Sequence, residues 1–341
     1  MSLSFGLFVN CGAPEGRDDA GVLDLAVAQA DHAERLGYDQ VWLTEHHFIR
    51  FGINPSALAF AGYLLGRTQR IRVGTAVTLA PLYHPLQLAE QAALLDQLSN
   101  GRFDFGLGRG GYRRDFEEFE IDSARWGIEV ERTLSALERA WAPGSDVLPR
   151  PRTQPFPPLY VASTTPASLD RAARIGAPLL HYFATPLDAR AKVEAAYREA
   201  ARAAEAPPQR GPHVHSFVCA VSDDAPATRA AIRDYLTRSF RDGDHPHVGG
   251  AASRGRHGPE GAPRDNAALA NGVADAALIG TPAELVRAFE TLRDEHGVRN
   301  AALYVEPCGE RSAVLETVSR FATEVMPRLS ASQRLRADHA P

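Results

Sequence analysis

Residues 85–107, PLQLAEQAALLDQLSNGRFDFGL, predict a helix that leads directly into a strand. Pro85 suits the first turn of a helix, because its fixed φ fits there and an N–H at that place would have no helical partner. Asn100 and Gly101 are the expected stop, since both residues tolerate the backbone of a helix C-terminus. Residues 102–107 then read as a strand. This step from helix to strand is the repeating unit of an α/β fold with a parallel sheet.

The same step recurs on both sides of this stretch. The predicted strands are residues 4–9, 40–43, 71–79, 102–107, 159–162, 178–183, 213–221 and 300–305. The predicted helices are residues 21–36 (closed by Gly37 as a C-cap), 55–67, 85–98, 166–175, 187–204, 225–240, 282–295 and 312–326. Strands that alternate with helices indicate βαβ units. About eight such units favour a closed (β/α)8 TIM barrel over two doubly wound domains.

Two stretches bear on the domain organisation. The Pro-rich bridge at residues 149–158 is either a domain linker or a long barrel loop, and the same rhythm on both sides favours the loop. Residues 241–272 are rich in Gly, His, Pro and Arg, and such a composition does not build a core. Long segments of this kind are either lids or disordered insertions. We therefore expect one barrel domain over residues 1–330, with a lid candidate at 241–272 and a tail at 331–341.

Composition and charge exclude several classes of function. The chain has 341 residues and a net charge of -5, so nothing predicts binding to nucleic acid or to an anionic membrane. No apolar run approaches the ~20 residues that span a bilayer, and the N-terminus lacks the features of a signal peptide, so we expect a cytoplasmic protein. Cys11, Cys219 and Cys308 lie far apart, which predicts neither a disulfide framework nor a metal site.

The segment VWLTEHHF, residues 41–48, ends an apolar strand in a carboxylate and two imidazoles. Polar side chains at the carboxyl end of a barrel strand lie at the mouth where barrel active sites form. Because neighbouring side chains alternate, His46 and His47 are expected to point to opposite sides. From spacing alone, two structural histidines are the favoured interpretation.

Two glycine- and hydroxyl-containing turns indicate an anion site. The segment GLGRGG, residues 106–111, follows a strand and presents Arg109, whose guanidinium suits a phosphate; the alternative is an exposed arginine in a turn. The segment VASTTPAS, residues 161–168, leads into a helix with Pro166 near its first turn, where free N–H groups and the helix dipole attract an anion. Its alternative is simple N-capping by Thr165.

These stretches and the segment GTAV, residues 74–77, together resemble the bacterial luciferase-like flavin-dependent monooxygenases, in particular the luciferase α subunit. The likeness extends over nearly the whole chain. Its most specific parts are WLTEHHF and LLDQLSNGRFDFGLGRGGYRRDF, to which GTAVTLAPLYHPLQLAE and YVASTTPASLDRAARIGAPLL add support.

The resemblance implies a (β/α)8 barrel that binds reduced FMN at the mouth formed by the carboxyl ends of its strands. By similarity, His46 stands at the place of the family's catalytic histidine. The residues expected to bind the cofactor are Ala76 and Val77 (a cis-linked pair beneath the ring system), Arg109 and the turn residues Thr164, Thr165 and Ser168 (at the phosphate), and Tyr112. The residues expected in the substrate pocket are Phe5, Phe8, Asp115 and Phe183.

Two departures from the family pattern bear on the substrate. The luciferase α subunit carries a reactive cysteine where this chain has Gly108, and a large indole where this chain has Phe183. Both replacements suit a pocket wall, so the flavin site is expected to be intact. They weaken the expectation of light emission and of a long-chain aldehyde substrate.

The expected activity is that of a two-component FMN-dependent monooxygenase. By resemblance, it inserts one oxygen atom of O2 into a small organic substrate through a flavin hydroperoxide, by hydroxylation, epoxidation or Baeyer–Villiger insertion. A separate NAD(P)H-dependent flavin reductase supplies reduced FMN, and a homodimer is expected through residues 53–67 and 84–98. An aromatic or polyketide-like metabolite is the suggested substrate. The alternatives are a deazaflavin-dependent oxidoreductase of the same superfamily, a luciferase-type aldehyde monooxygenase and a non-enzymatic flavin-binding subunit.

Overall fold

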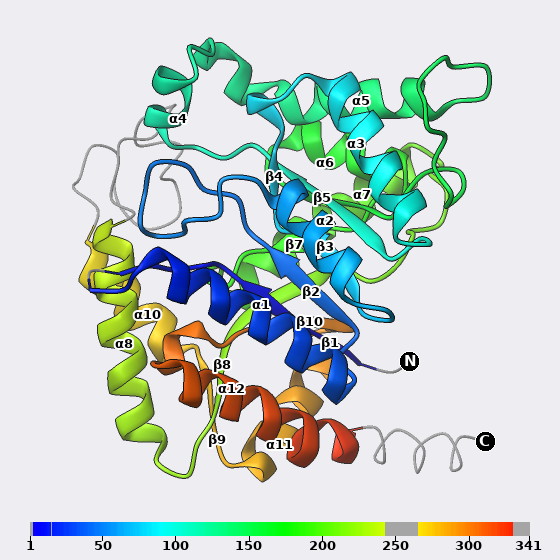
Figure 1. The fold of residues 1–341 in the computed structure, drawn as a ribbon. Coiled ribbons are helices and arrows are strands. Elements are labelled where there is room, and N and C mark those ends of the chain that lie inside the picture. Colours follow the sequence, from blue (N-terminus) through cyan, green and yellow to red (C-terminus); the bar gives the residue numbers. More distant parts are fainter. Residues whose placement is uncertain (1–2, 15, 243–264, 330–341) are drawn as a thin grey trace, which may run out of the picture.

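A ring of parallel strands lies at the centre of the computed structural model, which describes residues 3–14, 16–242 and 265–329 (Figure 1). The strands of the ring are β1 (Ser4–Val9), β2 (Gln40–Leu43), β3 (Arg72–Thr75), β5 (Phe103–Gly108), β6 (Leu159–Ala162), β7 (Leu180–His181), β8 (Val214–Val221) and β10 (Asn300–Tyr304). Each pairs in parallel with its neighbour, and β10 pairs with both β1 and β8. A bridge between Val161 and Leu179 joins β6 to β7 and closes the ring. The predicted (β/α)8 barrel is thereby confirmed.

Helices cover the outside of this ring. The longer ones are α1 (Asp19–Leu36), α2 (Ala57–Arg67), α3 (Pro85–Leu98), α5 (Glu129–Trp141), α6 (Pro166–Arg174), α7 (Leu187–Ala203), α8 (Ala225–Asp242), α10 (Asn266–Asp275), α11 (Pro282–Asp294) and α12 (Arg311–Arg320). Shorter elements are β4 (Thr78–Leu79), β9 (Leu278–Gly280), α4 (Arg113–Glu118), the 3-10 turns η1 (Ala80–Leu82), η2 (Ser123–Gly127) and η3 (Glu306–Cys308), and the π-helical η4 (Phe321–Val325). Within the described ranges, none of the helices combines the length and the apolar character that a membrane crossing requires.

The stretch at residues 85–107 folds as its sequence indicates. Pro85 occupies the first turn of α3, and the His84 side chain accepts a hydrogen bond from the N–H of Leu86. The turn that ends the helix places Asn100 and Gly101 in the left-handed region, at φ 57° and 82°. The chain then enters β5, which is buried along its whole length.

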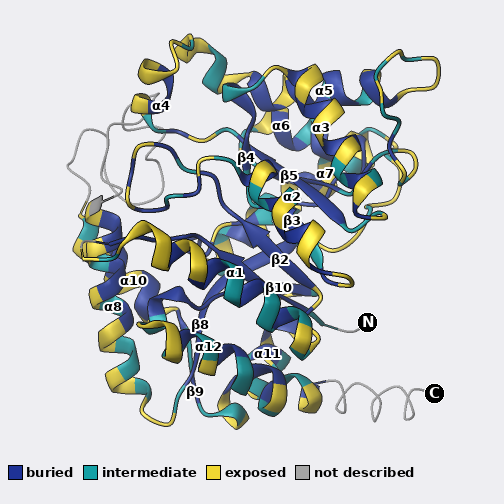
Figure 2. Ribbon diagram, viewed as in Figure 1, coloured by how far each residue is buried: buried dark blue, intermediate teal, exposed yellow. Residues whose placement is uncertain are grey.

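Side-chain alternation divides the interior into two apolar clusters. The strands of the ring are mostly buried, and the exposed residues lie mainly on the surrounding helices and loops (Figure 2). On β1, Leu7 and Val9 point outward and pack beneath the helices, together with Val41, Phe105 and Leu303 from neighbouring strands. Phe8 points inward, into a second cluster inside the ring that also holds Trp42, Tyr160 and Tyr304. Burial on both faces is what parallel barrel strands require, and all eight residues of β8 are buried.

Several details differ from the sequence-based expectations. The predicted strand at residues 71–79 is two strands, β3 and β4. They are separated at Ala76–Val77 by a non-proline cis peptide bond, which the resemblance had implied for this pair. The strand predicted at residues 178–183 is reduced to β7. Helix α5, helix α10 and strand β9 were not predicted, and α10 begins within the lid candidate at residues 241–272. The remainder of that lid candidate, residues 243–264, and the predicted tail lie outside the described residues.

The Pro-rich bridge connects two strands that are neighbours in the ring, β5 and β6. It is fastened to α3, because the Asp96 carboxylate accepts hydrogen bonds from the Thr153 N–H and hydroxyl at 2.7 and 2.8 Å. The Gln97 side chain also donates to the Arg150 carbonyl at 2.8 Å. The bridge is therefore a loop of the barrel, as the sequence rhythm favoured.

Candidate active site

A cavity of about 340 Å³ opens at the carboxyl ends of the ring strands. Six successive strand ends supply its walls, in agreement with the position of active sites in such barrels. Seven of the residues expected at the site line it: Phe8, His46, Ala76, Val77, Arg109, Tyr112 and Thr164. The volume lies in the range of about 300–1,000 Å³ that is usual for small-molecule sites.

His46 and His47 lie on opposite sides of the chain, as alternation predicted. His46 faces the cavity, where its ring centre is 5.1 Å from that of Phe51 and 6.3 Å from that of Tyr112. His47 points away into a separate hollow, edge-on to Phe119 at 5.0 Å, with its Nε2 atom 3.8 Å from a carboxylate oxygen of Glu45. His46 is therefore the imidazole available to a ligand in the cavity.

The imidazole of His46 is neutral at physiological pH. Burial, assisted by neighbouring His47, lowers the pKa of His46 from its ordinary value to about 3. A neutral ring offers one N–H donor and one acceptor nitrogen. A low pKa favours hydrogen bonding, rather than proton exchange near neutral pH, as the role of His46.

The carboxylate of Glu45 holds the strand ends around His46 in place. One oxygen accepts hydrogen bonds from the Ala57 N–H at 3.0 Å and the Tyr83 hydroxyl at 3.1 Å. The other oxygen accepts from the Leu79 N–H at 3.2 Å. The side chain therefore ties the start of α2 and the residues after the Ala76–Val77 pair to the end of β2. The sequence showed Glu45 beside the histidines, but gave it no such role.

The Ala76–Val77 pair forms a small-residue floor in the cavity. Before it, the Thr75 hydroxyl donates to the Gly106 carbonyl at 2.7 Å and accepts from the Gly106 N–H at 2.9 Å, which fixes β3 against β5. Beside it, a Cβ atom added to Gly108 would stand 2.3 Å from Cγ2 of Val77. The glycine at position 108 thus makes room for Val77.

Arg109 projects from the glycine turn after β5 and lies against an aromatic ring. Its guanidinium is 4.0 Å from the centre of the Trp126 ring, and the Trp126 indole N–H donates to the Gly110 carbonyl at 3.2 Å. Gly110 has a φ of 64°, a conformation that glycine adopts without strain. Trp126, which the sequence did not single out, therefore braces both the arginine and the turn that carries it.

The second turn brings hydroxyl groups to the same cavity. Ser163 and Thr164 line the wall, and Thr165 lies behind them with its hydroxyl 3.2 Å from that of Ser163 and 2.9 Å from that of Ser168. The Thr165 side chain makes no capping hydrogen bond to α6, so simple N-capping does not account for it. Arg109 and two residues of the turn before α6, Ser163 and Thr164, consequently line one cavity, whereas Thr165 and Ser168 do not line it.

Three of the expected pocket residues lie elsewhere. Phe5 and Phe8 are three residues apart in β1, so their side chains lie on opposite faces of the strand. Phe5 therefore points outward and packs edge-on against Phe289 and Phe321, with ring centres 5.2 Å apart in both pairs. Phe183 is buried inside the ring against Phe8 and Tyr304, and does not reach the cavity.

Asp115 is the third misplaced residue. Its side chain is buried in α4 rather than exposed to the cavity, and one carboxylate oxygen has no hydrogen-bond partner. Burial, with the Glu45 charge adding to it and His47 opposing it, raises the pKa of Asp115 to about 6. Asp115 therefore belongs to the surroundings of His47 and not to the pocket wall.

Other lining residues were missed by the sequence reasoning. They are Asn10, Thr44, Phe51, Ser163, His181, Tyr182 and Thr185, among others. Asn10 follows β1 as His46 follows β2, so a search for polar residues after every predicted strand would have found it. Its amide donates to the Phe51 carbonyl at 2.5 Å, and its N–H donates to the buried carboxylate of Glu306 at 2.8 Å.

Comparison with known proteins agrees with this arrangement. The luciferase-like monooxygenase family matches residues 3–300. The chain is 27% identical to an alkanal monooxygenase alpha chain of Photorhabdus luminescens, over 97% of its own length and 98% of that protein.

Two solved structures share the fold. The monooxygenase RslO1 from Streptomyces bottropensis has a TM-score of 0.80 at 26% identity, and the match covers 96% of this chain and 99% of that one. The oxygenating constituent of 3,6-diketocamphane monooxygenase from Pseudomonas putida, solved in complex with FMN, has a TM-score of 0.74 at 20% identity, with the same coverage. At 20% identity, the second likeness concerns the fold alone.

Proposed function

This chain belongs to the luciferase-like monooxygenase family, and from that premise we propose that it is the oxygenase component of a two-component FMN-dependent monooxygenase. It takes reduced FMN from a separate NAD(P)H-dependent reductase and inserts one oxygen atom of O2 into a small organic substrate. The observation that supports the proposal is that Arg109, the hydroxyl turn before α6 and His46 all line one cavity.

The phosphate end of the cavity has the donors that a phosphate monoester needs. Arg109 supplies a permanent positive charge, and the stacking on Trp126 limits the positions that its guanidinium can take. Ser163 and Thr164 supply hydroxyl groups at the wall. The N-terminus of α6 adds the positive end of the helix dipole and N–H groups without helical partners. A dianion at this end is therefore held by charge, dipole and hydrogen bonds together.

The ring end of the cavity suits a flat aromatic system. Ala76 and Val77 provide a floor with little side-chain bulk, while Phe8, Phe51 and Tyr112 provide apolar walls. The neutral N–H of His46 lies beside this floor and is available to a carbonyl or other acceptor on the ring or the substrate. These residues orient the ligand and exclude water, which protects reactive species from side reactions.

When bound, reduced FMN supplies the two electrons with which one atom of O2 enters the substrate and the other leaves as water. The protein's part is to bind, orient and shield, since the difficult chemistry belongs to the cofactor. Hydroxylation, epoxidation and Baeyer–Villiger insertion are all compatible with this site. The partly apolar wall at Phe8 and Phe51 favours an aromatic or similarly apolar metabolite as the substrate class.

We also propose that the chain acts as a homodimer through neighbouring helices α2 and α3. Their outer faces expose Tyr63, Leu94 and Leu98, the last at 72% of its full area. Exposed apolar residues gathered on one face are typical of an association surface. Sedimentation of Leu98→Lys tests this assignment, with Leu23→Lys as the control, because Leu23 is an exposed leucine on another helix, α1. A dimer that persists in Leu98→Lys contradicts it.

Anaerobic titration with reduced FMN and with reduced riboflavin tests the cofactor assignment, because the two ligands differ only at the phosphate. We expect Arg109→Gln to weaken reduced FMN binding by about 10–100-fold, the equivalent of a lost charge-assisted hydrogen bond, while riboflavin binding stays within about twofold. Arg113→Gln, an exposed arginine four residues further on, is the control. Wild-type protein that does not bind reduced FMN, or an equal loss for both ligands, contradicts the proposal.

The reaction type requires a second assay. With reduced FMN, 18O2 and candidate aromatic substrates, we expect a product heavier by one labelled oxygen. Turnover with a reduced deazaflavin under strict anaerobiosis would instead establish the deazaflavin-dependent alternative. Uncoupled oxygen consumption with no product from any aldehyde or aromatic substrate would favour a flavin-binding subunit.

A further inference from the structure

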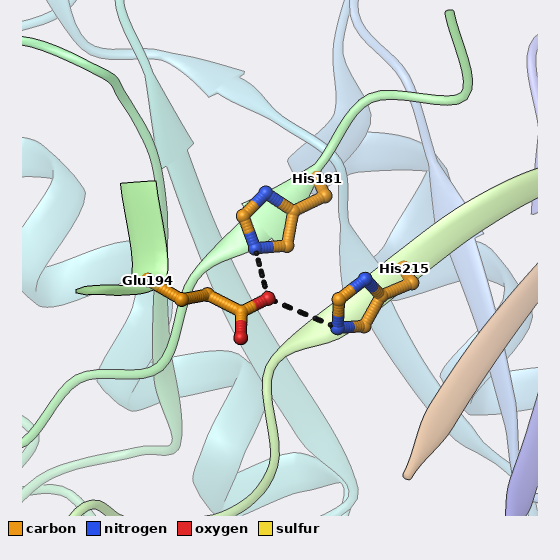
Figure 3. A group of neighbouring side chains, drawn as sticks. All are labelled: His181, Glu194 and His215. Atoms are coloured by element: carbon orange, nitrogen blue, oxygen red, sulfur yellow. Dashed lines mark ion pairs between the residues drawn. The ribbon is translucent and has the colours of Figure 1, made fainter. Parts of the chain in front are cut away.

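We propose that His181, Glu194 and His215 form a binding site for one divalent transition-metal ion of the zinc class, in the wall of the cavity. The three side chains converge from separate elements, as Figure 3 shows. Their donor atoms all lie within 4.8 Å of one another. This site is separate from the FMN-binding residues, and the sequence analysis did not predict it.

The fold places the two histidines side by side. His181 on β7 and His215 on β8 are directly paired in the parallel register of these strands. Their rings lie 4.8 Å apart between centres, at an interplanar angle of 34°. Glu194 reaches them from α7, the helix that follows β7. Two rigid strands and one helix therefore set the donor positions, which is the support that a preformed metal site needs.

The separations of the donor atoms suit a single ion. Oε1 of Glu194 is 3.1 Å from Nε2 of His181 and 3.4 Å from Nε2 of His215. Ligands at the ~2.1 Å bond length of zinc stand about 3.0–3.5 Å from one another in tetrahedral or octahedral geometry. The three donors lie within 4.8 Å of one another, so an ion bound to all of them requires rotation of the side chains to bring the donors to these separations.

The chemistry of the donor set selects the class of metal. Two imidazoles and one carboxylate suit Zn²⁺, Co²⁺, Ni²⁺ or Fe²⁺, whereas Mg²⁺ and Ca²⁺ prefer oxygen ligands throughout.

The surrounding charges leave Oε1 facing the imidazoles. Arg198, which is mostly exposed, lies 3.6 Å from the other oxygen, Oε2. The buried guanidinium of Arg190 is directed at backbone carbonyls, including that of Ser216 at 2.9 Å. An ion at the site would thus meet one carboxylate, whose other oxygen faces Arg198, while Arg190 is directed at backbone carbonyls.

The position of His181 gives the site a consequence for the cavity. His181 lines the cavity wall, as do Tyr182 and Thr185 in the loop that leads to α7. A metal ion that joins His181 to Glu194 and His215 would fix this loop and α7 to the strands of the barrel. We expect the ion to have a structural effect on the substrate-facing wall, separate from the redox reaction.

Metal titration of the full chain tests the proposal. After treatment with a chelator and its removal, we expect the protein to bind one equivalent of Zn²⁺ in competition with a chromophoric chelator, and to show a higher melting temperature. Glu194→Gln and His215→Gln each remove a proposed direct ligand of the ion. Loss of a residue that only supports a ligand usually lowers metal affinity by about 10–100-fold, so we expect each variant to lose more Zn²⁺ affinity than that. Glu199→Gln, an exposed carboxylate on the same helix, should bind as the wild type does.

Other histidines require a separate control. His245, His247 and His257 lie outside the described residues, so the titration is repeated in the His245→Gln/His247→Gln/His257→Gln variant, in which the stoichiometric site should remain. X-ray absorption of the zinc-loaded wild type should show two imidazole ligands and one carboxylate. The proposal is wrong in any of three cases: the protein binds no equivalent of Zn²⁺, Glu194→Gln binds Zn²⁺ as tightly as the wild type, or X-ray absorption shows another ligand set. The cluster is then a hydrogen-bonded triad only.

Discussion

Gly108 and Val77 occupy complementary volumes at the floor of the cavity: a Cβ atom on Gly108 would stand 2.3 Å from Cγ2 of Val77. Such a separation is far below van der Waals contact, so any larger side chain at position 108 must displace Val77. The floor beneath the ring site is shaped by both residues together.

We accordingly predict that Gly108→Ala lowers the free energy of unfolding by about 1–3 kcal/mol, the usual effect of overpacking. It should also weaken reduced FMN binding, because Val77 is forced into the cavity. Urea unfolding and anaerobic titration measure the two effects. Gly66→Ala in α2 is the matched control, since nothing lies within 4 Å of its Cβ position, and it should be neutral or slightly stabilising. A stable Gly108→Ala variant with unchanged binding contradicts the prediction.

Trp126 is predicted to act on FMN affinity through Arg109. Trp126→Leu removes the stacking surface 4.0 Å from the guanidinium, and a partly exposed cation–π contact contributes about 0.5–1 kcal/mol. We therefore expect reduced FMN to bind about 2–5-fold more weakly, with little change for reduced riboflavin. Trp126→Phe keeps an aromatic ring but loses the hydrogen bond to Gly110, so its smaller effect separates stacking from bracing of the turn. Equal losses for both ligands would show that Trp126 acts on the whole cavity.

The strands and helices of the ring were predictable because each has a local signal. In residues 85–107, Pro85 marks the start of the helix, Asn100 and Gly101 mark its end, and the residues that follow have the pattern of a strand. Helix α5 was equally predictable, since Val130, Leu134, Leu137 and Trp141 recur at helical spacing on its buried face. Strand β9 spans only three residues, which is too short for a periodicity to appear. The break between β3 and β4 depends on the surrounding structure and has no local signal.

The sequence could predict only those parts of the candidate site that a single residue and its local sequence context indicate. Arg109 and the turn at Thr164 have recognisable local contexts, and the barrel rule places both at the mouth. Phe5 was misplaced because the alternation of β1 was not applied to it. The cluster of His181, Glu194 and His215 brings together two strands and a helix, so no spacing along the sequence could indicate it. Sites that arise from packing between elements become visible only in three dimensions.

Glu306 is predicted to stabilise the loop after β1. Its buried carboxylate accepts hydrogen bonds from the N–H groups of Asn10, Cys11 and Gly12 at 2.8, 3.0 and 3.0 Å. Glu306→Gln removes the charge and turns an amide N–H towards these donors, so we expect a loss of about 2–3 kcal/mol in unfolding free energy. Glu310→Gln, whose side chain is 90% exposed, should change stability by less than about 1 kcal/mol. Similar effects for both variants would argue against the buried hydrogen bonds.

Asp115 is predicted to make stability fall as pH rises. Its pKa is about 6 in the folded chain and near 4 when unfolded, so between these values the folded state binds more protons. Stability is therefore highest below pH 4 and decreases up to about pH 6. Asp115→Asn should remove this dependence and raise the unfolding free energy by about 1–2 kcal/mol at pH 7, with little change at pH 4. Urea unfolding at both pH values measures it; Glu117→Gln, exposed on the same helix, is the control.

His46 is predicted to have the opposite effect on stability. Its pKa is about 3 in the folded chain and near 6.5 when unfolded. Below pH 6.5 the unfolded state therefore binds more protons than the folded state. The free energy of unfolding falls as pH falls, by at most ~1.4 kcal/mol per pH unit. His46→Gln should flatten this slope in urea unfolding between pH 7 and pH 5.

His46 is also predicted to act on activity as a neutral hydrogen-bond donor. His46→Gln should therefore keep activity within about tenfold, whereas His46→Leu should lose about 100-fold or more. An imidazole signal that titrates between pH 6 and 7 by NMR, and that is absent from His46→Gln, would show instead that His46 exchanges protons near neutral pH.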